Sequence, residues 1–166
     1  MGVGMLAELQ EATKTHNPDD IFDVKQTGAP YYDGMIENPK YYEEEKGKRF
    51  YIKRITPAQY FEALEAFGRG VKGIERQVVQ DKLVNRYADE MAGGKKYNVP
   101  YIEIEYTDTT YFGRTQEPYV SISQEGRHRA AAAEQLGAKT MPVMVIVPTD
   151  KKQYNFVAQK MPDFLK

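Results

Sequence analysis

The stretch of sequence that decides the fold is SQEGRHRAAAAEQLG, residues 123–137. A β-strand is expected to end here, Gly126 allows a sharp turn, and a helix is expected to follow at once over residues 127–136. The run Ala130–Ala133 predicts a closely packed helix face, and Gly137 predicts the end of the helix. The stretch therefore predicts a strand–turn–helix unit with basic side chains at the turn.

Those basic side chains are Arg127, His128 and Arg129. The first amides of a helix have no partner within the helix, and the helix dipole adds partial positive charge there. Acidic residues are the usual choice at this position, so two arginines predict a bound anion, for which phosphate is the natural candidate. In an alternative interpretation, the arginines form ion pairs on the sheet surface with Glu103, Glu105 or Glu125.

Outside this unit the sequence alternates short strands with helices. Strands are predicted at residues 49–55, 100–106, 118–123 and 141–147, and further helices at residues 57–67, 74–91 and 150–160. Thr56, Pro57 and Gln59 predict a capping box at the start of the first helix. We therefore expect an α/β or α+β fold with a small mixed sheet packed against helices.

Three of these helices carry apolar residues at helical spacing, which predicts the faces that pack on the body of the protein. The predicted buried positions are Tyr60, Phe61, Leu64 and Phe67 in the first helix, Val79, Leu83, Tyr87 and Met91 in the second, and Tyr154, Val157, Ala158 and Met161 in the last.

Residues 1–47 are rich in turn signals and are expected to form an irregular N-terminal arm. Helical patches are expected within it at residues 6–13 and 40–45, and the tyrosine pairs at 31–32 and 41–42 are expected to pack the arm onto the core. The predicted organisation is this arm, a domain over residues 48–148 and a C-terminal helix over residues 149–166 that packs on the domain.

Composition excludes several functional classes. The chain has 166 residues, no cysteine and a formal net charge of −1. Without cysteine there are no disulfides, thiolate zinc sites, iron–sulfur clusters or cysteine nucleophiles. The balanced charge argues against tight non-specific DNA binding by bulk positive charge. No apolar run is long enough to span a membrane, and the first residues do not have the pattern of a signal peptide, so we expect a cytoplasmic protein without a membrane partner.

Residues 125–132, followed by Leu136-Gly137 and Met141-Pro142-Val143, resemble the signature of the ParB/sulfiredoxin superfamily. Ile52–Gln59 is similar to the opening strand and I-x-P-x-Q stretch of that family, so the resemblance covers about residues 49–148. Glu125 before Gly-Arg-His-Arg is most similar to the ParB-like N-terminal or nuclease domains of phages and mobile elements. For a phage protein, the compartment would be the cytoplasm of the host cell.

The resemblance implies that Gly126, Arg127, His128 and Arg129 form a cradle for the phosphates of a nucleotide or a nucleic acid. It implies catalytic roles for Arg127 and His128, with Glu125 holding a metal-bound water or orienting Arg127. The sequence departs from two branches of the family. Sulfiredoxins need a cysteine at the position of Arg127, and partition clamps continue into DNA-reading and dimerisation modules, for which residues 148–166 are too short.

A cofactor, if one is used, is expected to be Mg²⁺ together with a nucleoside triphosphate, because Mg²⁺ takes carboxylate, phosphate and water ligands. Glu103 and Glu105 are candidate metal ligands, since alternate strand residues share one face; the alternative is a solvated sheet face. No zinc, haem or iron–sulfur cluster is expected.

Two functional hypotheses follow. In the first, the protein binds nucleotide or nucleic acid and acts as a Mg²⁺-dependent nuclease, nucleotide hydrolase or phosphotransferase, with His128 as general acid or base. In the second, the fold is a non-catalytic module that binds a virion or host protein through the N-terminal arm.

Overall fold

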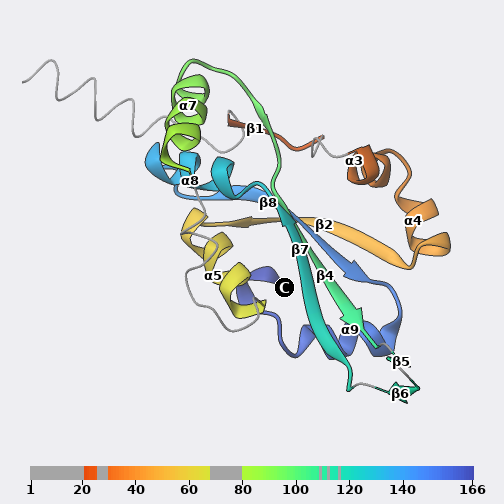
Figure 1. Ribbon diagram of the computed structural model, residues 1–166. Coiled ribbons are helices and arrows are strands. Elements are labelled where there is room, and N and C mark those ends of the chain that lie inside the picture. Colours follow the sequence, from red (N-terminus) through yellow and green to blue (C-terminus); the bar gives the residue numbers. More distant parts are fainter. Residues whose placement is uncertain (1–20, 26–29, 68–79, 109, 112, 116) are drawn as a thin grey trace, which may run out of the picture.

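A computed structural model describes residues 21–25, 30–67, 80–108, 110–111, 113–115 and 117–166. The fold is mixed α+β, as predicted, with helices packed around a mixed sheet of four strands (Figure 1). The strands of this sheet are β2 (Lys48–Ile55), β4 (Tyr101–Thr107), β7 (Tyr119–Glu125) and β8 (Met141–Pro148). The helices are α3 (Pro30–Glu37), α4 (Pro39–Glu45), α5 (Pro57–Phe67), α7 (Asp81–Ala92), α8 (Arg127–Gln135) and α9 (Lys151–Ala158).

Two pairs of short strands and a 3₁₀ turn complete the described chain. The parallel pair β1 (Phe22–Asp23) and β3 (Tyr97–Asn98) lies apart from the main sheet, and β5 (Thr110–Tyr111) pairs with β6 (Arg114–Thr115). A 3₁₀ turn, η1 (Asp163–Leu165), follows α9. In the part of the chain that the structure describes, no helix has the length and apolar character that crossing a membrane requires.

The sheet has the strand order β2-β8-β4-β7. The pairs β2/β8 and β4/β7 are antiparallel, whereas β4 and β8 are parallel neighbours. Every residue of β8 is buried, as expected for an apolar strand with a neighbour on each side and helices over both faces. The last strand in the sequence is therefore the centre of the core.

Successive side chains of each strand point to opposite faces of the sheet. Ile102 and Ile104 of β4 point to the face where α5 and α9 pack, and Tyr106 there meets Phe156 of α9 edge to face. Glu103 points to the opposite face, where Tyr32 of α3 contacts it. The helices α3 and α4 thus cover one face and α5 and α9 the other.

The predicted capping box at the start of α5 is confirmed. The Gln59 amide donates to the Thr56 hydroxyl at 3.0 Å, and the Thr56 amide donates to the Gln59 side chain at 2.9 Å. All four apolar residues predicted to face the core from this helix are buried. The capping residues and the spacing of apolar residues therefore predicted both the start and the buried face of α5.

The second predicted helix differs from the structure in its start and its buried face. The helix α7 begins at Asp81, with Gln80 as N-cap, and the predicted positions 74–79 lie outside the described residues. Val84, Ala88 and Met91 are buried, whereas Leu83 and Tyr87 are half-buried. Met91 is buried as predicted, but the other two buried positions lie one residue after the predicted ones, on the side where α7 packs against the alanine-rich helix α8.

Within the predicted N-terminal arm, the helix expected at residues 40–45 is confirmed as α4, and α3 precedes it where none was predicted. Ile21, Phe22, Tyr32 and Met35 are buried, so the described part of the arm contributes to the core. The helical patch predicted at residues 6–13 lies outside the described residues.

Candidate functional site

The turn between β7 and α8 is built on Gly126. Its φ of +116° lies in the left-handed region, a backbone conformation that residues other than glycine rarely adopt. A Cβ at this position would lie 2.6 Å from Cβ and 2.9 Å from Cα of Pro100, which precedes β4. Both the backbone angle and the close approach of Pro100 therefore require glycine, and they hold the start of α8 against the sheet.

The start of α8 leaves backbone donors free. The first hydrogen bond of the helix runs from the Ala130 amide to the Gly126 carbonyl at 2.9 Å. The amides of residues 127–129 consequently have no acceptor within the helix, and Gly126 provides no side-chain cap. A hollow of about 160 Å³ adjoins this turn, and its lining residues are Tyr87 and residues 124–129.

Arg129 is held by two partners. Its Nη2 donates to Glu125 Oε2 at 2.7 Å, its Nη1 donates to Glu125 Oε1 at 2.5 Å, and its Nε donates to the Asn98 carbonyl at 2.9 Å. The predicted alternative, an ion pair with a nearby glutamate, is thus confirmed for Arg129. The expectation that Glu125 orients Arg127 is not met, because this carboxylate is directed to Arg129.

Arg127 and His128 differ from Arg129 in having buried nitrogen atoms without partners. Among the described residues, Arg127 Nε and His128 Nε2 are buried and have no hydrogen-bond partner. Unpaired buried donors and acceptors cost free energy, so they commonly mark positions completed by a ligand or water. All five residues predicted at this site, Glu125 to Arg129, line the same hollow.

The same surroundings lower the pKa of His128 below its usual value of 6.5. The main cause is burial, and the positive charges of Arg127 and Arg129 add to it. The imidazole is therefore mainly neutral near pH 7, and one ring nitrogen can accept a proton or a hydrogen bond.

The lowered pKa of His128 leads to a prediction about how its titration and the stability of the protein depend on pH. In an NMR titration, the histidine signal that disappears in His128→Asn is expected to titrate below pH 6.5 in the free protein. Because the folded state holds this proton less tightly than the unfolded state, stability should fall as the pH decreases from 6.5 through the lowered pKa. His128→Asn should flatten this part of the pH–stability curve. A titration midpoint above 6.5 would contradict the described environment.

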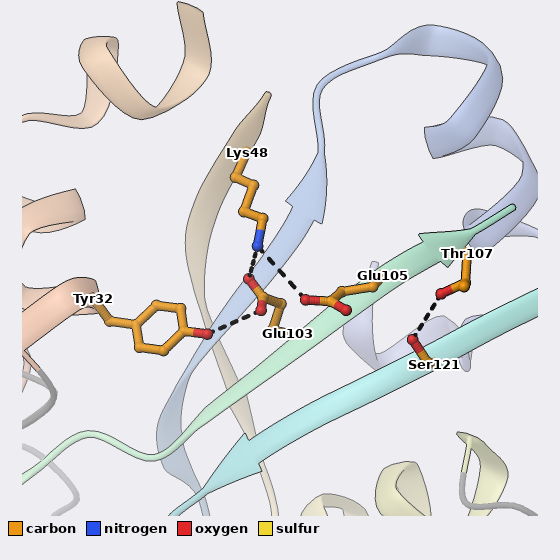
Figure 2. A network of polar contacts seen from close by, with 6 residues as sticks. All are labelled: Tyr32, Lys48, Glu103, Glu105, Thr107 and Ser121. Carbon is orange, nitrogen blue, oxygen red and sulfur yellow. Dashed lines mark hydrogen bonds and ion pairs between the residues drawn. The ribbon is translucent and has the colours of Figure 1, made fainter. Parts of the chain in front are cut away.

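Glu103 and Glu105 do not lie in this hollow; they form a separate network with Lys48 (Figure 2). Lys48 Nζ lies 2.8 Å from Glu103 Oε2 and 3.6 Å from Glu105 Oε1, and the Tyr32 hydroxyl donates to Glu103 Oε1 at 2.9 Å. The predicted shared face is confirmed. The alternative of a solvated face is wrong for Glu103, which is only 3% exposed.

The two carboxyl groups of this network behave differently. A hydrogen bond with the Glu103 carboxylate, together with burial, raises the pKa of Glu105. Burial alone would raise the pKa of Glu103, but hydrogen bonds from Glu105, Lys48 and Tyr32 outweigh it and hold the pKa below its usual range. Lys48 thus occupies the position of a cation between the carboxylates. No group of three or more potential metal-ligating side chains occurs within the described ranges.

Sequence reasoning did not identify Tyr32, Lys48 or Tyr87 as residues of a site. Tyr32 and Tyr101 have ring centroids 4.1 Å apart, and Tyr101 lies opposite Glu125 in the β4/β7 ladder. Two tyrosine rings in tilted contact, with an interplanar angle of 40°, therefore lie between the Glu103 network and the Glu125–Arg129 pair. Only the apolar–polar alternation of residues 101–106 hints at this face, because contacts between distant strands leave no local pattern.

Comparisons of the chain with protein-family models, with curated proteins and with solved structures found no match. The class that the fold itself defines is a mixed α+β protein with a basic strand–glycine–helix turn. The ParB/sulfiredoxin resemblance stays a prediction.

Proposed function

We propose that this chain is a ParB/sulfiredoxin-like protein of the phage or mobile-element type. It binds a phosphate of a nucleotide or nucleic acid, in the cytoplasm, at the turn between β7 and α8. The observation that carries the proposal is the pair of buried nitrogens without a partner among the described residues, Arg127 Nε and His128 Nε2, beside the amides of residues 127–129, which have no acceptor within the helix. Oxygen atoms of one phosphate can accept from Arg127 Nε and several of these amides at once, and His128 lies beside them.

Charge supports the same assignment. Among the described residues that line the hollow, Glu125 and Arg129 neutralise each other and His128 is mainly neutral near pH 7, so Arg127 supplies the net positive charge. The helix dipole adds to it. A hollow of about 160 Å³ suits a phosphate group better than a whole nucleotide, so the rest of the ligand would lie along the surface.

Magnesium fits this site as an ion that enters with the ligand. The carboxylate next to the turn is that of Glu125, and both of its oxygens accept from Arg129. With that carboxylate occupied, Mg²⁺ would bind mainly through the phosphates of the ligand and through water, and it would supply charge neutralisation there.

If the protein turns over its ligand, Arg127 and His128 are the residues proposed to act. The Arg127 guanidinium would stabilise negative charge on the phosphate oxygens. His128, neutral because of its lowered pKa, would accept a proton from the attacking water or hydroxyl group. The corresponding reactions are phosphodiester hydrolysis and phosphoryl transfer.

The test is a thermal-shift titration with ATP, CTP, GTP and short single-stranded DNA, with and without Mg²⁺. A ligand at about 100 times its Kd should raise the melting temperature by about 5 °C or more, because only the native state binds it. Arg127→Ala should abolish this shift, since it removes the uncompensated charge and a donor of the hollow.

The matched control is Lys151→Ala at the start of α9, which removes one exposed positive charge away from the turn. It should keep the ligand-dependent shift. If no ligand gives a shift at millimolar concentration, phosphate binding is refuted and the protein-binding hypothesis takes its place. A shift that Arg127→Ala retains would locate the ligand elsewhere.

A further inference from the structure

Arg129 already holds an anion in the described structure. Two of its guanidinium nitrogens meet the two carboxylate oxygens of Glu125, in the parallel two-bond geometry that guanidinium groups also form with phosphate. The Arg129 side chain is 11% exposed, whereas that of Glu125 is 40% exposed. The carboxylate is thus the solvent-facing member of the pair, and both residues line the hollow beside Arg127.

The guanidinium has an anchor that does not depend on Glu125. Arg129 Nε donates to the Asn98 carbonyl at 2.9 Å, and Asn98 is held in the parallel β1/β3 pair. If the carboxylate moved away, the remaining two nitrogens would stay directed toward the hollow. Arg129 is therefore prepared to receive another anion without reorganising.

We propose that Glu125 is a built-in competitor for the ligand, occupying in the free protein the two nitrogens of Arg129 that a bound phosphate takes over. This inference rests on the proposed function of the turn. The phosphate first meets Arg127 and the free amides, and it then displaces the Glu125 carboxylate from Arg129. The ligand phosphate thereby replaces the Glu125 carboxylate on the Arg129 guanidinium. Because the ion pair with Glu125 must first be broken, Glu125 lowers the affinity of the site for phosphate.

The decisive variant is Glu125→Gln, which keeps the shape of the side chain and an oxygen acceptor but removes its charge. The probe is inorganic pyrophosphate, followed by NMR through the Gly126 amide signal. Loss of the competing charge should increase affinity about tenfold. A hydrogen bond between charged partners is stronger than one to a neutral group by about the free energy that corresponds to a tenfold change in Kd.

The control for net charge is Glu44→Gln, which breaks an i,i+4 ion pair with Lys40 on α4, at the other side of the molecule (Figure 1). It changes the net charge by the same amount and should leave pyrophosphate affinity unchanged. Unfolding curves of both variants ensure that each is folded at the titration temperature.

A double-mutant cycle separates displacement from general electrostatics. Arg129→Lys keeps the positive charge but cannot form the two-bond geometry. Under the proposal, Glu125→Gln raises affinity about tenfold with Arg129 present and less than about threefold with Lys at that position. Equal gains in both backgrounds, or no gain with Arg129, would overturn the inference while leaving phosphate binding intact. Failure of pyrophosphate to bind any variant would instead refute the proposed function.

Discussion

Lys48→Met is expected to lower the free energy of unfolding by about 3–5 kcal/mol, because it leaves the Glu103 carboxylate buried without its charged partner. Glu103 is 3% exposed, and Lys48 Nζ lies 2.8 Å from its carboxylate. The methionine retains most of the apolar stem, so the loss reports on the charge. Chemical denaturation at pH 7 measures the difference.

The pH dependence of this effect has a definite sign. Since the pKa of Glu103 is lowered in the native protein, its contribution is present above about pH 4.5 and is lost as the pH falls through the lowered pKa. The deficit of Lys48→Met should therefore shrink in acid, where Glu103 can be buried as a neutral group. The double variant Lys48→Met/Glu103→Gln should recover most of the stability at pH 7.

Lys40→Met is the matched control, because it removes a lysine from an ion pair whose members are 84% and 61% exposed. Its stability should stay close to that of the wild type, as exposed pairs contribute little. Equal losses from Lys40→Met and Lys48→Met would mean that burial of Glu103 does not determine the effect.

Gly126→Ala is expected to cost about 3 kcal/mol or more and to abolish phosphate binding. Two independent penalties combine: a left-handed backbone, roughly 1–2 kcal/mol, and a methyl group forced against Pro100, roughly 1–3 kcal/mol. Relief of the clash would shift the first turn of α8 and with it the free amides. Denaturation and the pyrophosphate titration measure the two effects.

Gly94→Ala separates the two penalties. Gly94 has a φ of +95°, but no atom would lie within 4 Å of an added Cβ. This variant should lose only the backbone part, about 1–2 kcal/mol, and keep the binding site. If both alanine variants lose the same stability, the contact with Pro100 is not the constraint that we describe.

Features encoded by neighbouring residues could be predicted from the sequence. The capping box of α5, the glycine turn before α8 and the buried strand β8 each depend on residues a few positions apart. For the same reason, the residues from Glu125 to Arg129 were correctly expected to lie together. Their chemical roles remain predictions.

Features that depend on pairing between distant elements could not be predicted. Glu103 meets Lys48 across β8, and it meets Tyr32 on a helix from a region expected to be irregular. Arg129 could have paired with any of three glutamates, and only the turn geometry selects Glu125. Met91 of α7 was placed correctly, but Val84 and Ala88 are buried in place of Leu83 and Tyr87, because contact with α8 decides which side of the helix is covered.

The strand order β2-β8-β4-β7 has a consequence for how the chain acquires its structure during synthesis. β2 and β4 are joined only through β8, which is made last of the four. While the ribosome is still adding residues before 141, the β4/β7 hairpin can form, but β2 still lacks β8, its neighbour among the described strands. The nascent chain must therefore wait, with apolar strand faces uncovered, until β8 emerges and inserts between them. Folding of the sheet is thus expected to be late and cooperative, governed by contacts between segments far apart in the sequence.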